Sequence, residues 1–301
     1  MGKSIEWSSY NRGLVNRGQI TFWFSPEVMG DWIAPRTNKR GGQLFYSEAV
    51  IEMMSVLRFR YNLTLRSTQG FTESIMELMG IELPIPDYTT LCRRLKSLSV
   101  DLKSKISAGT VHVVIDSTGL KIYGEGEWKV RQHGYSKRRS WMKLHLAIDS
   151  SNNQIISAAL SDNSFKDNQL FSELIDEIPG SIGQVSADGA YDSKDCYRKA
   201  EERNFMPAFP PRRGSKLRQH GNVSGTKDMR DENIRGVRSL GRKGWKKSVN
   251  YHQRSLSETA MFRFKTIFGE KMSSREFERQ ANEAFIKCQI LNKMVTPKFV
   301  I

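Results

Sequence analysis

The chain is predicted to fold as an α/β protein, with a mixed β-sheet flanked by helices after a helical N-terminal region. Two observations support this prediction. Apolar residues repeat at helical spacing before about residue 108 and then change to short runs rich in β-branched residues. Strand patterns come first in the second part and then alternate with helical ones, as in a sheet covered by helices. The predicted domains are therefore residues 1–107 and 108–301.

The N-terminal region is predicted to contain three helices, because cap residues stand where helical patterns begin or end. Ser47 and Asp87 are placed to cap the first and third helices, and Gly80 would end the second. Residues 1–40 show no such pattern and are expected to be irregular. The predicted helices are residues 47–63, 68–79 and 87–98.

The third predicted helix is basic and carries Arg93, Arg94 and Lys96. Short helices joined by turns, with a basic helix last, are compatible with a DNA-binding helix-turn-helix. These three side chains are therefore candidate DNA contacts. A helical bundle that only packs against the rest of the chain is an equally good interpretation.

The second region is predicted to hold a sheet whose last strand lies at an edge, because that strand contains Pro207. Helices are predicted over residues 167–178 and 193–203, and residues 277–291 also follow a helical period that would cover the core. The predicted strands are residues 111–116, 124–132, 143–149, 154–160, 182–188 and 206–209.

Two aspartates stand at predicted strand ends. Asp116 ends or nearly ends the first strand, and Asp188 ends a later strand before Gly189. Open α/β sheets bind ligands beyond the carboxyl ends of their strands, so both carboxylates are expected in one crevice. A strand-end aspartate is also often only a turn cap.

The most specific spacing is Tyr251-x2-Arg254-x3-Glu258-x6-Lys265. Helix positions three, four and seven apart share a face, so these four residues are predicted to form one stripe on a helix. The opposite face would pack on the core. A carboxylate between Arg and Lys can hold a divalent cation while its neighbours bind phosphate. The alternative is a surface ion pair of little energetic value.

Together, Asp116, Asp188 and Glu258 are predicted to form a metal site. Three crowded carboxylates raise one another's pKa unless cations neutralise them. Hard oxygen ligands favour Mg²⁺ or Mn²⁺, and two such ions roughly 3.5–4 Å apart would serve phosphodiester chemistry.

The charge balance points to a polyanionic partner. The net charge is +15 and the pI about 9.8, which suits a phosphate backbone. No apolar run is long enough to span a membrane, and three well-separated cysteines suggest a reducing cytosol.

Residues 211–250 alone contribute +9 of the net charge. They are predicted to form a mobile or partner-ordered loop that follows DNA phosphates, with a merely solvated loop as the alternative. The candidate DNA contacts closest to Tyr251 are Arg242, Lys243, Lys246 and Lys247.

These motifs resemble bacterial insertion-sequence transposases of the DDE class. The resemblance rests on Val-Val-Ile-Asp-Ser-Thr-Gly-Leu-Lys around Asp116, Ser-Ala-Asp-Gly-Ala-Tyr-Asp around Asp188, and the Tyr-Arg-Glu-Lys spacing. Further matching segments begin at Ile20, Gly124 and Trp141. The resemblance implies a ribonuclease H-like core, with the three acids as metal ligands. It also implies that Arg254 and Lys265 contact DNA near the cleaved phosphate, with Tyr251 in the same site.

The implied function is a transposase that binds the terminal inverted repeats of its element, cleaves at the ends and joins the 3′-hydroxyls to target DNA. Pairing two ends requires a dimer or larger assembly on DNA, located in the cytoplasm with the bacterial nucleoid. Two alternatives remain open at this stage. One is a catalytically silent repressor of the same repeats, and the other is a structure-specific nuclease on the same fold.

Overall fold

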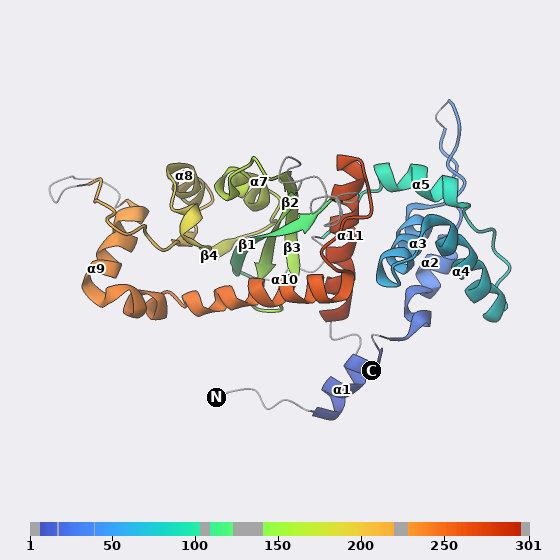
Figure 1. The fold of residues 1–301 in the computed structure, drawn as a ribbon, viewed down its shortest axis with the longest axis horizontal. Helices are drawn as coiled ribbons and strands as arrows, with labels where there is room; N and C mark the ends of the chain where they lie inside the picture. The colour runs from blue at the N-terminus through green and yellow to red at the C-terminus, as the bar shows by residue number, and fades with distance from the viewer. Residues whose placement is uncertain are drawn as a thin grey trace, which may run out of the picture. The chain divides into compact units, whose positions relative to one another are not determined.

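The computed structural model describes residues 7–16, 18–38, 40–102, 109–122, 141–219 and 228–295. The chain divides into two compact units (Figure 1). The first combines Met1–Val100 with Ser274–Ile301, and the second is Asp101–Ser273. This division differs from the sequence-based one, which gave residues 274–301 to the sheet-containing domain. The predicted boundary at residue 107 lies a few residues beyond the structural one.

The first unit contains the three predicted helices, α3 (Glu48–Arg60), α4 (Leu65–Leu78) and α5 (Tyr88–Ser97). The predicted caps at α3 and α5 are confirmed. The Ser47 hydroxyl accepts a hydrogen bond from the backbone N–H of Val50 at 3.4 Å, and the Asp87 carboxylate accepts one from Thr89 at 2.7 Å. Each bond satisfies an N–H that the first helical turn leaves without a backbone partner.

The prediction that residues 1–40 are irregular is wrong. The structure contains α1 (Trp7–Asn16), the 3₁₀ helix η1 (Ile20–Trp23) and α2 (Pro26–Gly30). Ser25 caps α2 through a hydrogen bond from Val28, and Pro26 occupies the first helical position. Both are known helix-start signals that the short length of α2 obscured.

The C-terminal helix α11 (Phe277–Val295) packs against α3 and α5, which explains its place in the first unit. Its Glu283 and Lys287 form a buried ion pair at 2.7 Å, and Lys293 lies 3.1 Å from Glu52 of α3. The helix was predicted, and its packing partners within the first unit are α3 and α5.

The second unit is built on a five-stranded mixed sheet with the order β3-β2-β1-β4-β5. Strand β2 is antiparallel to β1 and β3, whereas β4 pairs in parallel with β1 and β5. The predicted edge position of Pro207 in β5 is confirmed, and the predicted strand at residues 124–132 lies outside the described residues. The strands are β1 (Val111–Lys121), β2 (Trp141–Asp149), β3 (Ile155–Asp162), β4 (Ile182–Ser186) and β5 (Met206–Ala208).

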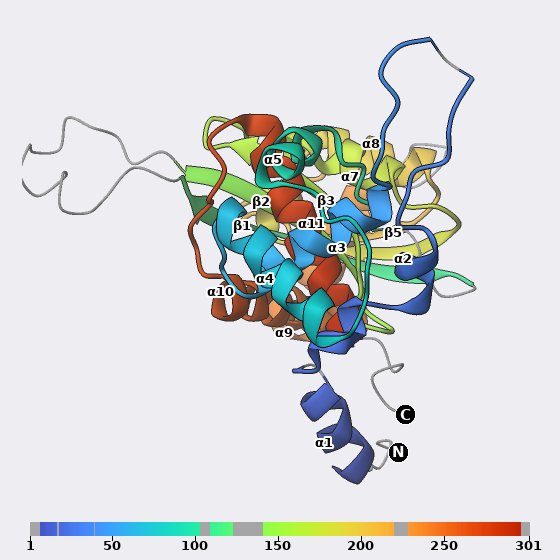
Figure 2. The ribbon, with the colours of Figure 1, turned by 90° about the vertical axis from the view of Figure 1, so that its right-hand side faces the viewer.

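Helices flank this sheet on both faces (Figures 1 and 2). On one side lie α7 (Phe171–Asp176) and α8 (Lys194–Glu202), and on the other lies α10 (Ser255–Phe268), which contacts β1 and β2. Phe171 is fully buried and its ring meets those of Tyr191, Phe205 and Phe209. The predicted α/β fold, with a mixed sheet flanked by helices, is therefore confirmed.

Residues 211–250 are not the loop that the sequence predicts. Most of the described part forms α9 (Met229–Ser248), which bends sharply at Gly241, where φ is 68°. The bend brings Trp245 against Gly236, whose missing side chain leaves room: a Cβ there would lie 2.7 Å from the indole. The helix was hard to recognise from the sequence because its residues are mostly basic, polar or glycine. Its large buried apolar residues, Ile234 and Trp245, are too far apart to show a helical period.

No helix within the described residues is long and apolar enough to cross a membrane.

Candidate active site

Strand pairing places Asp116 and Asp188 at the same level of the sheet. Val114 of β1 pairs in parallel with Ser186 of β4, and each aspartate lies two residues further along its chain. Strand β1 runs on to Lys121, so Asp116 lies in the middle of the strand, which corrects the prediction that it is at or near the end. Asp188 follows the end of β4 and caps the short helix η3 (Gly189–Tyr191), accepting the N–H of Ala190 at 2.9 Å.

Asp116 is a largely buried carboxylate whose side chain is 17% exposed. Burial raises the pKa of Asp116, the charge of Arg254 lowers it, and the nearby Asp188 raises it again, with a net upward shift. The N–H of Ser117 donates to Oδ1 at 2.9 Å, and the Ser257 hydroxyl lies 3.3 Å from Oδ2. The carboxylate is therefore hydrogen-bonded but is left with an unfavourable environment for its charge.

Arg254 joins two of the predicted catalytic acids. Its Nη1 lies 2.7 Å from Oδ2 of Asp116, and its Nη2 lies 3.1 Å from Oε1 of Glu258. The Glu258 side chain is 63% exposed, so it can move without breaking any core packing. One guanidinium thus holds a strand residue and a helix residue together by opposite charge.

The residues of the Tyr-Arg-Glu-Lys motif do not form the stripe on a single helix that the sequence predicted. Tyr251–Arg254 is a 3₁₀ helix, η4, and α10 begins only at Ser255. Asn250, with φ of 51°, turns the chain between α9 and η4. Arg254 still reaches Glu258, because the two are one α-helical turn apart across the junction.

Tyr251 and Lys265 contact other residues than the three predicted metal ligands contact. Tyr251 is buried against Trp245, with ring centroids 6.1 Å apart, and burial raises the pKa of Tyr251 to about 12. Lys265 pairs with Glu270 at 3.4 Å, and the same glutamate lies 3.1 Å from Lys121. The structure therefore brings Asp116, Arg254 and Glu258 into contact, but it pairs Lys265 with a different carboxylate.

The carboxylates of Asp116, Asp188 and Glu258 suit a hard divalent cation, but they do not form one cluster. Within the described ranges, no group of three or more His, Cys, Asp or Glu side chains is close enough to hold a metal ion. Asp116 and Asp188 are level with each other, and a positive guanidinium lies between Asp116 and Glu258. Oxygen ligands of this kind prefer Mg²⁺ or Mn²⁺.

The predicted DNA contacts of α5 have partners within the first unit. Lys96 lies 2.9 Å from Glu278, and Arg94 donates to the backbone carbonyl of Tyr46 at 2.8 Å. Arg93 is exposed and reaches the Thr90 hydroxyl at 3.2 Å. The role of all three in DNA binding stays a prediction.

The four candidates near Tyr251 all lie in the second half of α9. Arg242, Lys243 and Lys247 are exposed, and Lys246 is half-buried with its Nζ 5.0 Å from the centre of the Tyr251 ring. Arg242 donates to the carbonyl of Pro211 at 2.7 Å. These side chains are placed by a helix and not by a loop, and their contact with DNA stays a prediction.

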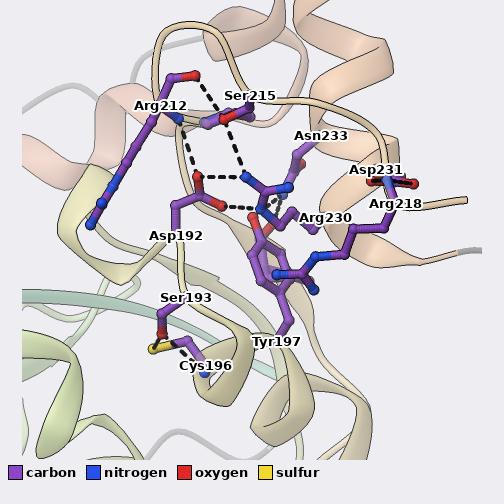
Figure 3. Close-up of polar contacts among 12 residues, drawn as sticks. Asp192, Ser193, Cys196, Tyr197, Arg212, Ser215, Arg218, Arg230, Asp231 and Asn233 are labelled. Carbon is purple, nitrogen blue, oxygen red and sulfur yellow. Dashed lines mark hydrogen bonds and ion pairs between the residues drawn. The ribbon is translucent and has the colours of Figure 1, made fainter.

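Sequence reasoning overlooked a buried ion pair four residues after Asp188 (Figure 3). The Asp192 side chain is fully buried, and the Nε of Arg230 donates to its Oδ1 at 2.8 Å. The N–H of Arg212 donates to Oδ2 at 3.2 Å. The place of Asp192 at the end of the Asp188 motif was the available signal, but its arginine partner is too distant in sequence to predict.

A neighbouring aspartate fixes the same segment. Oxygens of Asp231 accept the backbone N–H groups of Arg218 at 2.9 Å and Gln219 at 2.7 Å. Burial acts to raise the pKa of Asp231, but these hydrogen bonds and nearby arginines lower it overall. The start of α9 therefore holds the basic segment that follows β5.

Comparisons with protein families agree with the resemblance to DDE transposases. Residues 107–293 match a family described as "Transposase DDE domain", and residues 15–125 match a second family with the same description. A solved structure of a piggyBac transposase synaptic complex with hairpin DNA is similar over 96% of this chain and 78% of that chain. Its sequence identity is 11% and its TM-score 0.43.

Proposed function

The chain belongs to the DDE transposase family, and we propose that it cleaves phosphodiester bonds at the terminal repeats of its element and joins the freed 3′-hydroxyls to target DNA. The observation that carries this proposal is the common level of Asp116, on β1, and Asp188, two residues after the paired strand β4, with Glu258 held next to Asp116 by Arg254. The enzyme is a transposase. The proposal concerns where it cleaves, what it joins and which residues take part.

Asp116, Asp188 and Glu258 are proposed to hold two Mg²⁺ or Mn²⁺ ions. When bound, the ions supply activation of a water or 3′-hydroxyl and stabilisation of the leaving oxygen. Asp116 is already largely buried and hydrogen-bonded, which fixes its direction. Glu258 is exposed and on a helix, so it is the acid whose side chain adjusts to complete the set.

Arg254 has two roles in this proposal. Without a divalent cation, it balances the charges of Asp116 and Glu258. When cations take over that balance, its planar fork becomes available to bind a DNA phosphate in a bidentate manner. The buried ring of Tyr251 supports the start of this segment, and Lys265 adds a positive charge further along α10.

The proposed partner is double-stranded DNA, both element ends and target. The basic side chains of α5 and α9 would contact mainly phosphates, which position the duplex without reading its sequence. Because two ends must be cut and joined together, we propose a dimer or a larger assembly that forms on DNA, in the cytoplasm with the chromosome.

The test uses the full chain, duplexes that contain the terminal sequences of its element, a target plasmid and Mg²⁺. We expect nicks or breaks at the end sequences and joining of their 3′-hydroxyls to the plasmid. Asp188→Asn should abolish both products, whereas Asp195→Asn, which changes an exposed aspartate on α8, should retain them. Cleavage that ignores the end sequence and never leads to joining would favour the nuclease. Binding without cleavage would favour the repressor.

A further inference from the structure

A cavity of about 310 Å³ opens beside Gly189, the residue that follows Asp188. Four cationic side chains line it, and Gly189, Pro210 and Pro211 complete its wall. The cationic residues come from the segment after β5 and from α9: Arg212, Arg213, Arg242 and Lys246. A site with this much positive charge and few apolar walls is suited to an anion.

The charges of this cavity are not neutralised by protein carboxylates. In the part of the chain that the structure describes, none of its four cationic side chains forms an ion pair with Asp or Glu. Arg242 uses one donor on the Pro211 carbonyl at 2.7 Å and keeps its other N–H groups. Asp192 is close in sequence to Gly189, but its charge is already balanced by Arg230.

The cavity wall is held in place by buried contacts. Asp192 accepts the backbone N–H of Arg212, and Arg230 donates to both oxygens of Asp192, at 2.8 and 3.4 Å (Figure 3). Arg230 also lies 3.2 Å from the Ser215 hydroxyl. Since the backbone of the segment is fixed before any ligand arrives, less conformational entropy is lost on binding.

The cavity also lies next to the candidate active site. The backbone of Gly189 passes so close to Pro210 that a Cβ would lie 3.4 Å from its carbonyl oxygen. On the other side, Lys246 reaches from the cavity to the ring of Tyr251. A ligand in the cavity would therefore sit between the chain that follows Asp188 and the segment that leads to Arg254.

We propose that this cavity binds one phosphate of the DNA strand and so positions that strand beside Asp188. Planar guanidinium groups match phosphate oxygens in a bidentate manner. The volume is at the low end of the range of about 300–1,000 Å³ found for ligand sites, which suits a phosphate and part of its sugar but not several nucleotides. The inference rests on the proposed function for the DNA substrate.

The experiment measures the affinity of the full chain for a fluorescein-labelled duplex of the terminal sequence over a series of salt concentrations. Each phosphate that the protein neutralises contributes about 0.9 to the slope of log K against log salt. The variant replaces all four cavity cations by Gln. Its charge-matched control replaces four exposed cations elsewhere in the same unit, Lys166, Lys194, Arg198 and Arg263.

If the four cavity residues share one phosphate, the cavity variant should lose about 0.9 from the slope relative to the matched control. Arg213→Gln alone should weaken binding several-fold with little change in slope, because the other three still hold the phosphate. A loss of about 0.9 for each residue removed would show contacts to separate phosphates and would overturn the proposal. So would a cavity variant that behaves like the control.

Thermal unfolding of both four-residue variants checks that these changes leave the fold intact. The result of this binding experiment can be distinguished from a failure of the proposed function. If the wild-type protein binds the duplex but never cuts it, the proposed function fails, while the salt slopes still decide whether the cavity holds a phosphate.

Discussion

Arg254 Nη1 lies 2.7 Å from Asp116 Oδ2, although 138 residues separate the two in sequence. The contact joins the middle of β1 to the junction between η4 and α10. It gives a buried carboxylate of raised pKa its main compensating charge. The same guanidinium reaches Glu258 at 3.1 Å, so a single side chain links two of the three proposed metal ligands.

Replacing Arg254 should therefore destabilise the metal-free protein. Arg254→Ala leaves the carboxylate of Asp116 buried without its counter-charge, and we expect a loss of about 1–3 kcal/mol in the free energy of unfolding at pH 7. Urea unfolding measures it. Arg263→Ala, an exposed position on the adjoining helix α10, should change stability by no more than about 0.5 kcal/mol.

Mg²⁺ should reduce the loss in Arg254→Ala, because a bound cation replaces the missing positive charge. An equal loss with and without Mg²⁺ would contradict the idea that the guanidinium and the metal neutralise the same carboxylates. No loss at all would show that the contact between Arg254 and Asp116 does not stabilise the fold.

The buried His145 should make stability depend on pH. Its side chain is fully buried on β2, with Nε2 3.0 Å from the Ser161 hydroxyl, and burial lowers the pKa of His145 from 6.5 to about 4. A lowered pKa in the folded state means that the unfolded chain binds the proton more readily. The contribution of His145 is thus present above about pH 6.5 and is lost as the pH falls toward 4.

The expected loss through this window is on the order of 2–4 kcal/mol, which urea unfolding at a series of pH values can measure. His145→Asn should flatten this part of the curve, whereas His252→Gln, which removes an exposed histidine, should not. An unchanged curve in His145→Asn would show that the pKa of His145 is the same in the folded and unfolded states.

The buried pair of Asp192 and Arg230 should be worth more than an exposed pair of the same kind. Asp192→Asn leaves Arg230 largely buried without its carboxylate, so we expect a loss of about 3–5 kcal/mol. Asp195→Asn breaks the exposed pair with Arg198 and should cost at most about 1 kcal/mol. Similar losses in both variants would mean that the Asp192 pair does not hold the segment after β5.

Much of the fold could be predicted because its signals are local. Ser47 and Asp87 begin helices through contacts with residues two or three positions away, and the apolar run from Val111 to Ile115 forms a buried strand. The alternation of strand and helix patterns indicated a mixed sheet covered by helices. Each of these features depends on neighbours in sequence.

The features that were missed depend on distant residues. Strand β1 continues past Asp116 because Gly119 and Lys121 pair with β2, which no local pattern indicates. Helix α9 is stabilised by Trp245 folding back on Gly236 and by caps from Asp228, against an unfavourable composition. The candidate acids could be named from their motifs, but the cationic cavity depends on how α9 folds beside Gly189.

The central claim is that Asp116, Asp188 and Glu258 act together as ligands of catalytic metal ions, and metal rescue tests it most directly. In Asp188→Cys a thiolate replaces a hard oxygen ligand. We expect end cleavage to fall by at least about tenfold with Mg²⁺, and to recover with Mn²⁺, which accepts sulfur more readily. Asp195→Cys should be active with both ions. Cleavage by Asp188→Cys that is equally fast with Mg²⁺ and Mn²⁺ would contradict metal binding by this residue.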